Sequence, residues 1–86
     1  MNAPTQLIRP LSVGERIQLF RKRQGWSQEK LVSEVAAEVP MSVRHLRRIE
    51  LGEEDNPGIK TLSVVAQKLG VSLATLLFGE IGEHRM

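Results

Sequence analysis

The sequence lacks cysteine and tyrosine, and its aromatic side chains are two phenylalanines and one tryptophan. Without cysteine there are no disulfide bonds and no thiolate-bound metals, which suits the reducing cytoplasm. Few aromatics argue against modules that stack nucleic-acid bases on aromatic platforms. No apolar run reaches membrane-spanning length, and the N-terminus has no signal-peptide pattern. We therefore expect a cytoplasmic protein that does not enter a membrane.

The charges of this chain are unevenly distributed, although the formal net charge is only +2 over 86 residues. Basic residues cluster at positions 21–23 and 44–48, whereas acidic residues cluster at positions 53–55 and in the C-terminal tail. A polarised surface of this kind indicates a polyanionic partner more clearly than the net charge does.

Apolar residues recur at helical spacing in several segments, and no segment shows the strict alternation of a strand. Good capping residues precede these segments, and glycine or proline follows them. The expected helices follow Ser12, Ser27, Ser42, Gly58 and Ser72, and they end near Gly25, Pro40, Gly52, Gly70 and Gly79. We predict a compact, all-α, five-helix domain over residues 12–79, with a flexible arm at 1–11 and a short tail at 80–86.

The helix expected after Ser42 separates apolar and basic side chains. At about 100° per residue, Leu46 and Ile49 share one side. The side chains of Arg44, Arg47 and Arg48 lie nearly opposite, within an arc of roughly 100°. Such a helix suits the major groove of DNA, because phosphates need cations and guanine edges need a planar donor fork. A solvated charged face is the simpler alternative for one helix alone.

Catalysis and metal binding find little support in the sequence. The histidines, His45 and His84, are far apart, and helix capping accounts for the serines at helix starts. The acidic run at 53–55 lacks the alternating ligand spacing of a calcium loop. We expect no catalytic residue, no metal and no cofactor.

Three motifs in order resemble the Cro/repressor-type helix-turn-helix family, the Xre-like regulators. They are GERIQLFRKRQGWSQEKL, MSVRHLRRIELG and NPGIKTLSVVAQKLGVSLATLLFGE, and together they cover roughly Val13 to Glu80. The resemblance implies a lambda-repressor-like fold and a regulator that binds double-stranded DNA.

The family's roles carry over to matching positions. The resemblance implies base reading by Val43, Arg44 and Arg48 and an ion pair between Arg21 and Glu50. Arg47 lies between the base-reading positions and is a candidate for a base or a phosphate contact. The resemblance also implies phosphate contacts from Gln28, which braces the recognition helix as well, and from Asn56 and the backbone near Gly58. Ser27, His45 and Lys60 are further candidates for phosphate contacts. Arg9 in the arm is a further candidate for a backbone or minor-groove contact.

The connection between the second and third helices departs from the family pattern. It is longer by about four residues, close to one helical turn, so we expect the second helix to be extended by a turn. Val32 and Pro40 replace the family's usual small residue and turn glycine, which puts the docking angle in doubt. The acidic loop 53–55 would repel phosphate if it faced DNA. The alternative is that it sets the distance to DNA or contacts a protein partner.

These observations predict a sequence-specific transcriptional regulator, a repressor acting as a homodimer on a palindromic operator. An apolar patch of Leu76, Leu77, Phe78 and Ile81 is the expected dimer interface. The alternative is a protein-interaction module, such as an antitoxin that neutralises a partner protein, with or without DNA binding of its own.

Overall fold

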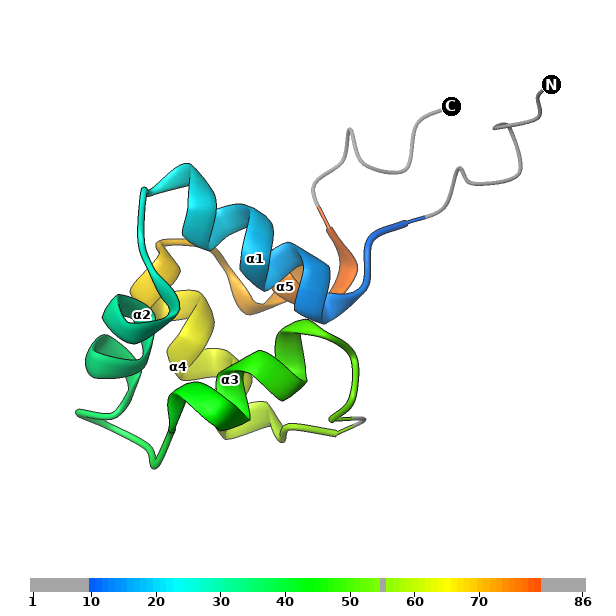
Figure 1. The fold of residues 1–86 in the computed structure, drawn as a ribbon. Coiled ribbons are helices and arrows are strands. Elements are labelled where there is room, and N and C mark those ends of the chain that lie inside the picture. Colours follow the sequence, from blue (N-terminus) through cyan, green and yellow to red (C-terminus); the bar gives the residue numbers. More distant parts are fainter. Residues whose placement is uncertain (1–9, 55, 80–86) are drawn as a thin grey trace, which may run out of the picture.

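The computed structural model describes residues 10–54 and 56–79, and all regular structure within these ranges is α-helical (Figure 1). The helices are α1 (Val13–Arg23), α2 (Gln28–Val35), α3 (Val43–Glu50), α4 (Ile59–Leu69) and α5 (Leu73–Phe78). The prediction of an all-α, five-helix domain is confirmed. Most of the predicted arm, including Arg9, and the predicted tail lie outside the described residues.

Serine side chains cap four of these helices as their positions predict. The Ser12 hydroxyl accepts from the Glu15 N–H at 3.1 Å, and the Glu15 carboxylate accepts from the Ser12 N–H at 2.8 Å, which completes a capping box. Ser27, Ser42 and Ser72 each accept one N–H from the first turn of the helix that follows. Helix α4 differs, because its N-cap is Gly58 and no side chain caps it.

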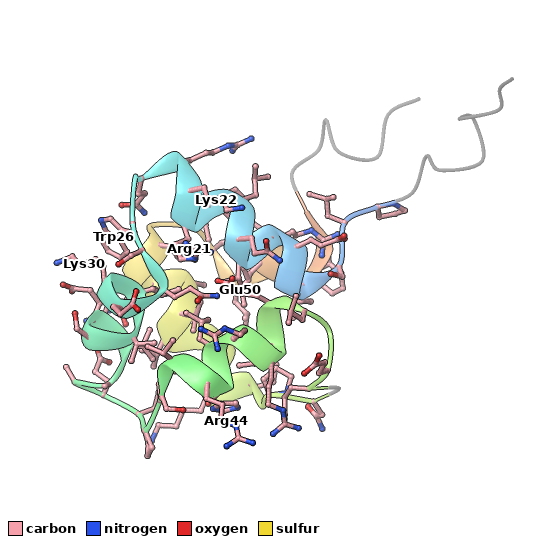
Figure 2. All side chains as sticks on the ribbon, in the orientation of Figure 1. Arg21, Lys22, Trp26, Lys30, Arg44 and Glu50 are labelled. Carbon is pink, nitrogen blue, oxygen red and sulfur yellow. The ribbon has the colours of Figure 1, made fainter. Side chains whose placement is uncertain are left out.

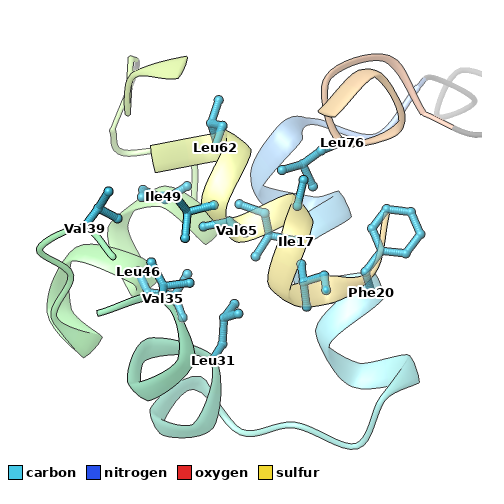
Figure 3. Close-up of a cluster of buried hydrophobic side chains, with 13 residues drawn as sticks. Ile17, Phe20, Leu31, Val35, Val39, Leu46, Ile49, Leu62, Val65 and Leu76 are labelled. Carbon is cyan, nitrogen blue, oxygen red and sulfur yellow. The ribbon is translucent and has the colours of Figure 1, made fainter. Parts of the chain in front are cut away.

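A single apolar core joins the five helices (Figure 3). Most core residues lie on the apolar face that the sequence period of their helix predicts, but Ile59, expected on that face of α4, is 60% exposed. The labelled core residues are Ile17 and Phe20 of α1, Leu31 and Val35 of α2, Leu46 and Ile49 of α3, Leu62 and Val65 of α4, Leu76 of α5, and Val39. The burial of Leu46 and Ile49 turns the opposite, basic face of α3 toward solvent.

Gly14 lets α1 approach the end of α3 closely. A Cβ atom built at this position would lie 2.7 Å from the carbonyl oxygen of Glu50 and would also overlap the carbonyl oxygen of Ile49. Both obstacles are backbone atoms that cannot rotate away. Glycine is therefore required here by packing, and it fixes the separation of α1 and α3.

The extra residues between α2 and α3 do not lengthen α2 as a regular helix, which corrects the expectation of an added helical turn. Helix α2 ends at Val35, and residues 36–38 form hydrogen-bonded turns instead. The Val39 N–H still reaches the Val35 carbonyl at 3.1 Å, and Val39 is buried. Pro40 offers no N–H to continue the helical ladder, so the chain turns toward α3. The buried apolar side chains of α2 are therefore continued by Val39, although the helix itself ends at Val35.

The residues of the predicted dimer patch differ in their exposure to solvent. Leu76 is fully buried in the monomer core, so its assignment to an interface is corrected. It is buried because α5 is short and needs one side chain to anchor it against α1 and α4. Leu77 is half-buried and Phe78 is 67% exposed, whereas Ile81 lies outside the described residues.

Within residues 10–54 and 56–79, no helix combines the length and the apolar character needed to cross a membrane.

Candidate nucleic-acid interface

Helix α3 presents its guanidinium groups away from the core. Arg44, Arg47 and Arg48 are exposed, whereas Leu46 and Ile49 on the opposite side are buried. Figure 2 shows the Arg44 side chain at the edge of the molecule, pointing away from the other helices. The structure therefore brings three predicted base-reading arginines together on one accessible face. Val43, at the start of α3, is half-buried.

A buried hydrogen-bond network fixes the C-terminal end of α3. The Glu50 carboxylate accepts from Arg21 Nε at 2.8 Å, from Arg21 Nη2 at 3.0 Å and from Gln28 Nε2 at 3.0 Å. Arg21 also donates from Nη1 to the Trp26 carbonyl at 2.9 Å. Glu50 is 4% exposed and Arg21 is 8% exposed, and the two side chains meet between α1 and α3 in Figure 2.

This network ties α1 and α2 to the basic helix. A bidentate pairing of guanidinium and carboxylate fixes both side chains in one geometry. It holds the orientation of α3 relative to the rest of the domain. The Arg21–Glu50 pair and the bracing contact of Gln28, both implied by the family resemblance, are thus present in the structure.

The predicted phosphate contacts lie at the starts of α2 and α4. Ser27 is exposed and Gln28 is half-buried at the start of α2, while Asn56 and Lys60 are exposed beside the start of α4. Gly58 has a φ of 91°, a left-handed conformation that favours glycine. With no side chain capping α4, its first backbone N–H groups are suited to bind an anion.

His45 lies beside the basic face without belonging to it. Its side chain is half-buried, and its backbone N–H donates to the Ser42 hydroxyl at 3.0 Å. A phosphate contact from this position would use the exposed part of the imidazole.

Arg48 has an acidic neighbour that sequence reasoning did not assign. Its Nη2 atom lies 3.6 Å from a carboxylate oxygen of Glu54, in the loop after α3. The side chain of Arg48 remains 50% exposed and that of Glu54 is 28% exposed. Glu54 of the acidic run therefore contacts the basic face of α3.

Three long side chains hold helix ends by donating to backbone carbonyls, and no sequence pattern predicts these contacts. Arg16 is 3% exposed and donates to the Leu77 carbonyl at 3.0 Å, at the end of α5. Gln18 donates to the Glu50 carbonyl at 2.9 Å, and Gln24 donates to the Leu69 carbonyl at 2.6 Å. A backbone acceptor has no residue type, so no motif marks such a contact.

An apolar groove of about 400 Å³ lies between the start of α1, the end of α3 and the start of α4. Its walls include Val13, Ile49, Ile59, Leu62 and Leu77. Ile59 is 60% exposed, so apolar surface continues beyond the groove.

Helix α2, the turn after it and helix α3 form a helix-turn-helix unit, in which α3 turns a basic face outward. This arrangement defines a helix-turn-helix protein. The chain belongs to the helix-turn-helix family, whose model matches residues 17–76.

Two curated relatives are transcriptional regulators. The chain is 37% identical over 65 residues to the HTH-type transcriptional regulator SinR of Bacillus licheniformis, covering 76% of this chain and 55% of that protein. It is 35% identical over 68 residues to the HTH-type transcriptional regulator SlrR of Bacillus subtilis (strain 168), covering 79% of this chain and 42% of that protein. The chain therefore spans about half the length of the curated relatives it matches.

Solved structures of SinR share the fold. A crystal structure of SinR in complex with DNA matches with a TM-score of 0.67 and 33% identity, covering 74% of this chain and 95% of that one. The N-terminal DNA-binding domain of SinR from Bacillus subtilis also matches at 0.67 and 33%, covering 74% and 87%. A SinR/SinI complex matches at 0.68 and 34%, covering 76% and 59%.

Proposed function

We propose that this chain is a sequence-specific regulator of transcription that binds double-stranded DNA and represses by occupying an operator. The observation that carries the proposal is the outward guanidinium face of α3, fixed from behind by the buried Arg21–Glu50 pair. The similarity to SinR, a homologue solved in complex with DNA, supports the same reading. No step of this mechanism is chemical: the bound protein excludes other proteins from the promoter.

Arg44 and Arg48 would read bases, with Val43 and Arg47 beside them. Each arginine can offer a planar fork to guanine O6 and N7, and each such contact contributes about 1–3 kcal/mol of discrimination. Arg47 lies between them in sequence and reaches either a base or a phosphate.

Phosphates on either side of the groove would bind at the starts of α2 and α4. Ser27 and Gln28 would bind phosphates of one strand. A second phosphate position would be bound by Asn56, the Gly58 backbone and Lys60. His45 adds a contact beside the recognition face. These groups set the register of the domain on the duplex and carry no sequence information themselves.

The protein would act as a homodimer on a palindromic operator. The exposed Phe78 and the half-buried Leu77 at the end of α5 supply an apolar surface that a two-fold partner would cover. Paired recognition helices would then reach half-sites about one turn of DNA apart.

Selection of bound sites from a random duplex pool, followed by salt titrations, tests the proposal. We expect a palindromic consensus and a steep loss of affinity with rising salt. Arg48→Ala should weaken the selected site more than random DNA, whereas Arg47→Ala should flatten the salt dependence. Lys22→Ala, on α1 and away from Arg44 in Figure 2, is the matched control and should change neither.

Absence of binding to any duplex at low salt would contradict the DNA-binding proposal. That result would favour the alternative of a protein-interaction module, in which the basic face of α3 meets an acidic protein. Equal weakening of selected and random DNA by Arg48→Ala would remove Arg48 from base reading while leaving DNA binding intact.

A further inference from the structure

The loop after α3 is folded back onto the helix by its own backbone. The Glu53 N–H donates to the Arg48 carbonyl at 2.8 Å, and the Gly52 N–H donates to the Ile49 carbonyl at 3.1 Å. This pair of bonds, with Gly52 at a φ of 77°, is a Schellman motif. The motif sets the direction in which the chain leaves α3. Along this path the Glu54 carboxylate lies 3.6 Å from Arg48 Nη2.

The contact leaves Arg48 available to a ligand. The closest approach to Glu54 is through the Nη2 atom, and half of the Arg48 side chain remains exposed. A guanidinium carries five N–H donors in a planar fork, so one edge can face a carboxylate while another faces a base. The geometry is therefore compatible with retention of the ion pair in a DNA complex.

We propose that Glu54 is a positioning residue for Arg48: it holds the guanidinium oriented for a guanine edge and keeps it from binding phosphate instead. The inference rests on the proposed DNA binding and assigns the acidic loop a part in sequence selection.

Two physical effects lead to this role. An arginine that is already oriented loses less side-chain freedom when it binds a base. A carboxylate beside the guanidinium also repels a phosphate that approaches the same group, which weakens contacts with random DNA. The first effect favours the correct site, and the second disfavours all other sites. Removing the carboxylate should therefore lower the ratio of specific to random binding.

Glu54→Gln tests the proposal against Glu53→Gln, which makes the same change of charge at the exposed neighbouring residue. We expect Glu54→Gln to lower the ratio of affinities for the selected site and for random duplex by about two- to tenfold. The salt dependence on random DNA should steepen by roughly one phosphate contact, a change of about 0.9 in the log–log slope. Glu53→Gln should leave both quantities close to those of the unsubstituted protein.

The Arg48→Ala background shows whether the effect passes through Arg48. There, Glu54→Gln should change the affinity ratio no more than Glu53→Gln does. If Glu54 instead competes with DNA for Arg48, Glu54→Gln will raise both affinities and the ratio will not fall, which overturns the proposal. Equal effects of Glu53→Gln and Glu54→Gln would also overturn it. The proposed function would survive either result, because it fails only if the unsubstituted protein does not bind DNA.

Discussion

At the scale of single residues, Glu50 links three helices through one side chain. One buried carboxylate accepts from both Arg21 and Gln28, and these residues come from α1 and α2. Burial of charge is unfavourable unless each charge is paired and hydrogen-bonded, and here both conditions are met. The network therefore orients α3 but makes the domain sensitive to loss of any one partner.

Glu50→Gln should lower the free energy of unfolding by about 3–5 kcal/mol, because it leaves the Arg21 guanidinium buried without a counter-charge. Urea denaturation followed by far-ultraviolet circular dichroism measures the change. Glu34→Gln is the matched control, since Glu34 belongs to the exposed Lys30–Glu34 pair and should have little effect. A Glu50→Gln protein as stable as the control would show that the pair does not hold α3.

At the scale of helices, the close contact between α1 and α3 depends on the absence of a Cβ atom at Gly14. Gly14→Ala should lower the free energy of unfolding by about 1–3 kcal/mol, because the added Cβ overlaps backbone atoms of α3. Thermal and urea denaturation test this expectation. Gln67→Ala, at an exposed position of α4, supplies a control within a helix that lacks such a contact. Unchanged or increased stability of Gly14→Ala would contradict the close approach.

The connection between α2 and α3 is held to α4 by an ion pair. Lys68 Nζ lies 2.7 Å from a carboxylate oxygen of Glu38. The hydrogen bond to Glu38 raises the pKa of Lys68 above its ordinary value of 10.5, although partial desolvation opposes the shift. A raised pKa means that the stabilisation is complete at neutral pH and is lost only as the pH rises through the raised value.

Lys68→Met should loosen this connection at neutral pH. The Val39 amide, bonded to the Val35 carbonyl, should exchange its hydrogen about twofold faster when the ion pair is absent. Lys60→Met, which removes an exposed lysine from the other end of α4, is the control. Equal exchange rates in the two variants would show that the pair does not restrain the connection.

The sequence predicted the helices and most of the core, because caps and apolar period are local properties of the chain. It was less informative where tertiary contacts decide the outcome. The residues after Val35 keep the apolar spacing of a helix but form turns. Leu76 was predicted to lie in an exposed dimer interface, but it is buried in the core. Arg21 and Glu50 were paired only through a family resemblance, and the contact of Glu54 with Arg48 needed the three-dimensional path of the loop.

At the scale of the whole molecule, one surface is basic and another is apolar. The outward face of α3 is basic, while the end of α5 exposes Phe78. A regulator that binds DNA as a dimer needs both a DNA-facing surface and a self-complementary one.

Phe78→Ser should weaken self-association without a large loss of stability, because the side chain is 67% exposed in the monomer. Sedimentation over a range of concentrations measures the proposed dimer, and we expect at least a tenfold weaker association for loss of an aromatic anchor, a loss of about 1.4 kcal/mol or more. Ala74→Ser, also exposed on α5, is the control. An unchanged dimer would exclude this end of α5 as the interface.

The most direct test of the account is a titration of the ¹⁵N-labelled protein with a duplex that contains one selected half-site. Backbone amide shifts report which residues meet DNA, and a single half-site separates DNA contacts from dimer contacts. We predict that the largest changes fall at Ser27 and Gln28, along Val43 to Arg48, and from Asn56 to Lys60. Changes centred on Lys22 and the rest of the outer face of α1, with α3 unaffected, would contradict the claim that α3 reads the duplex.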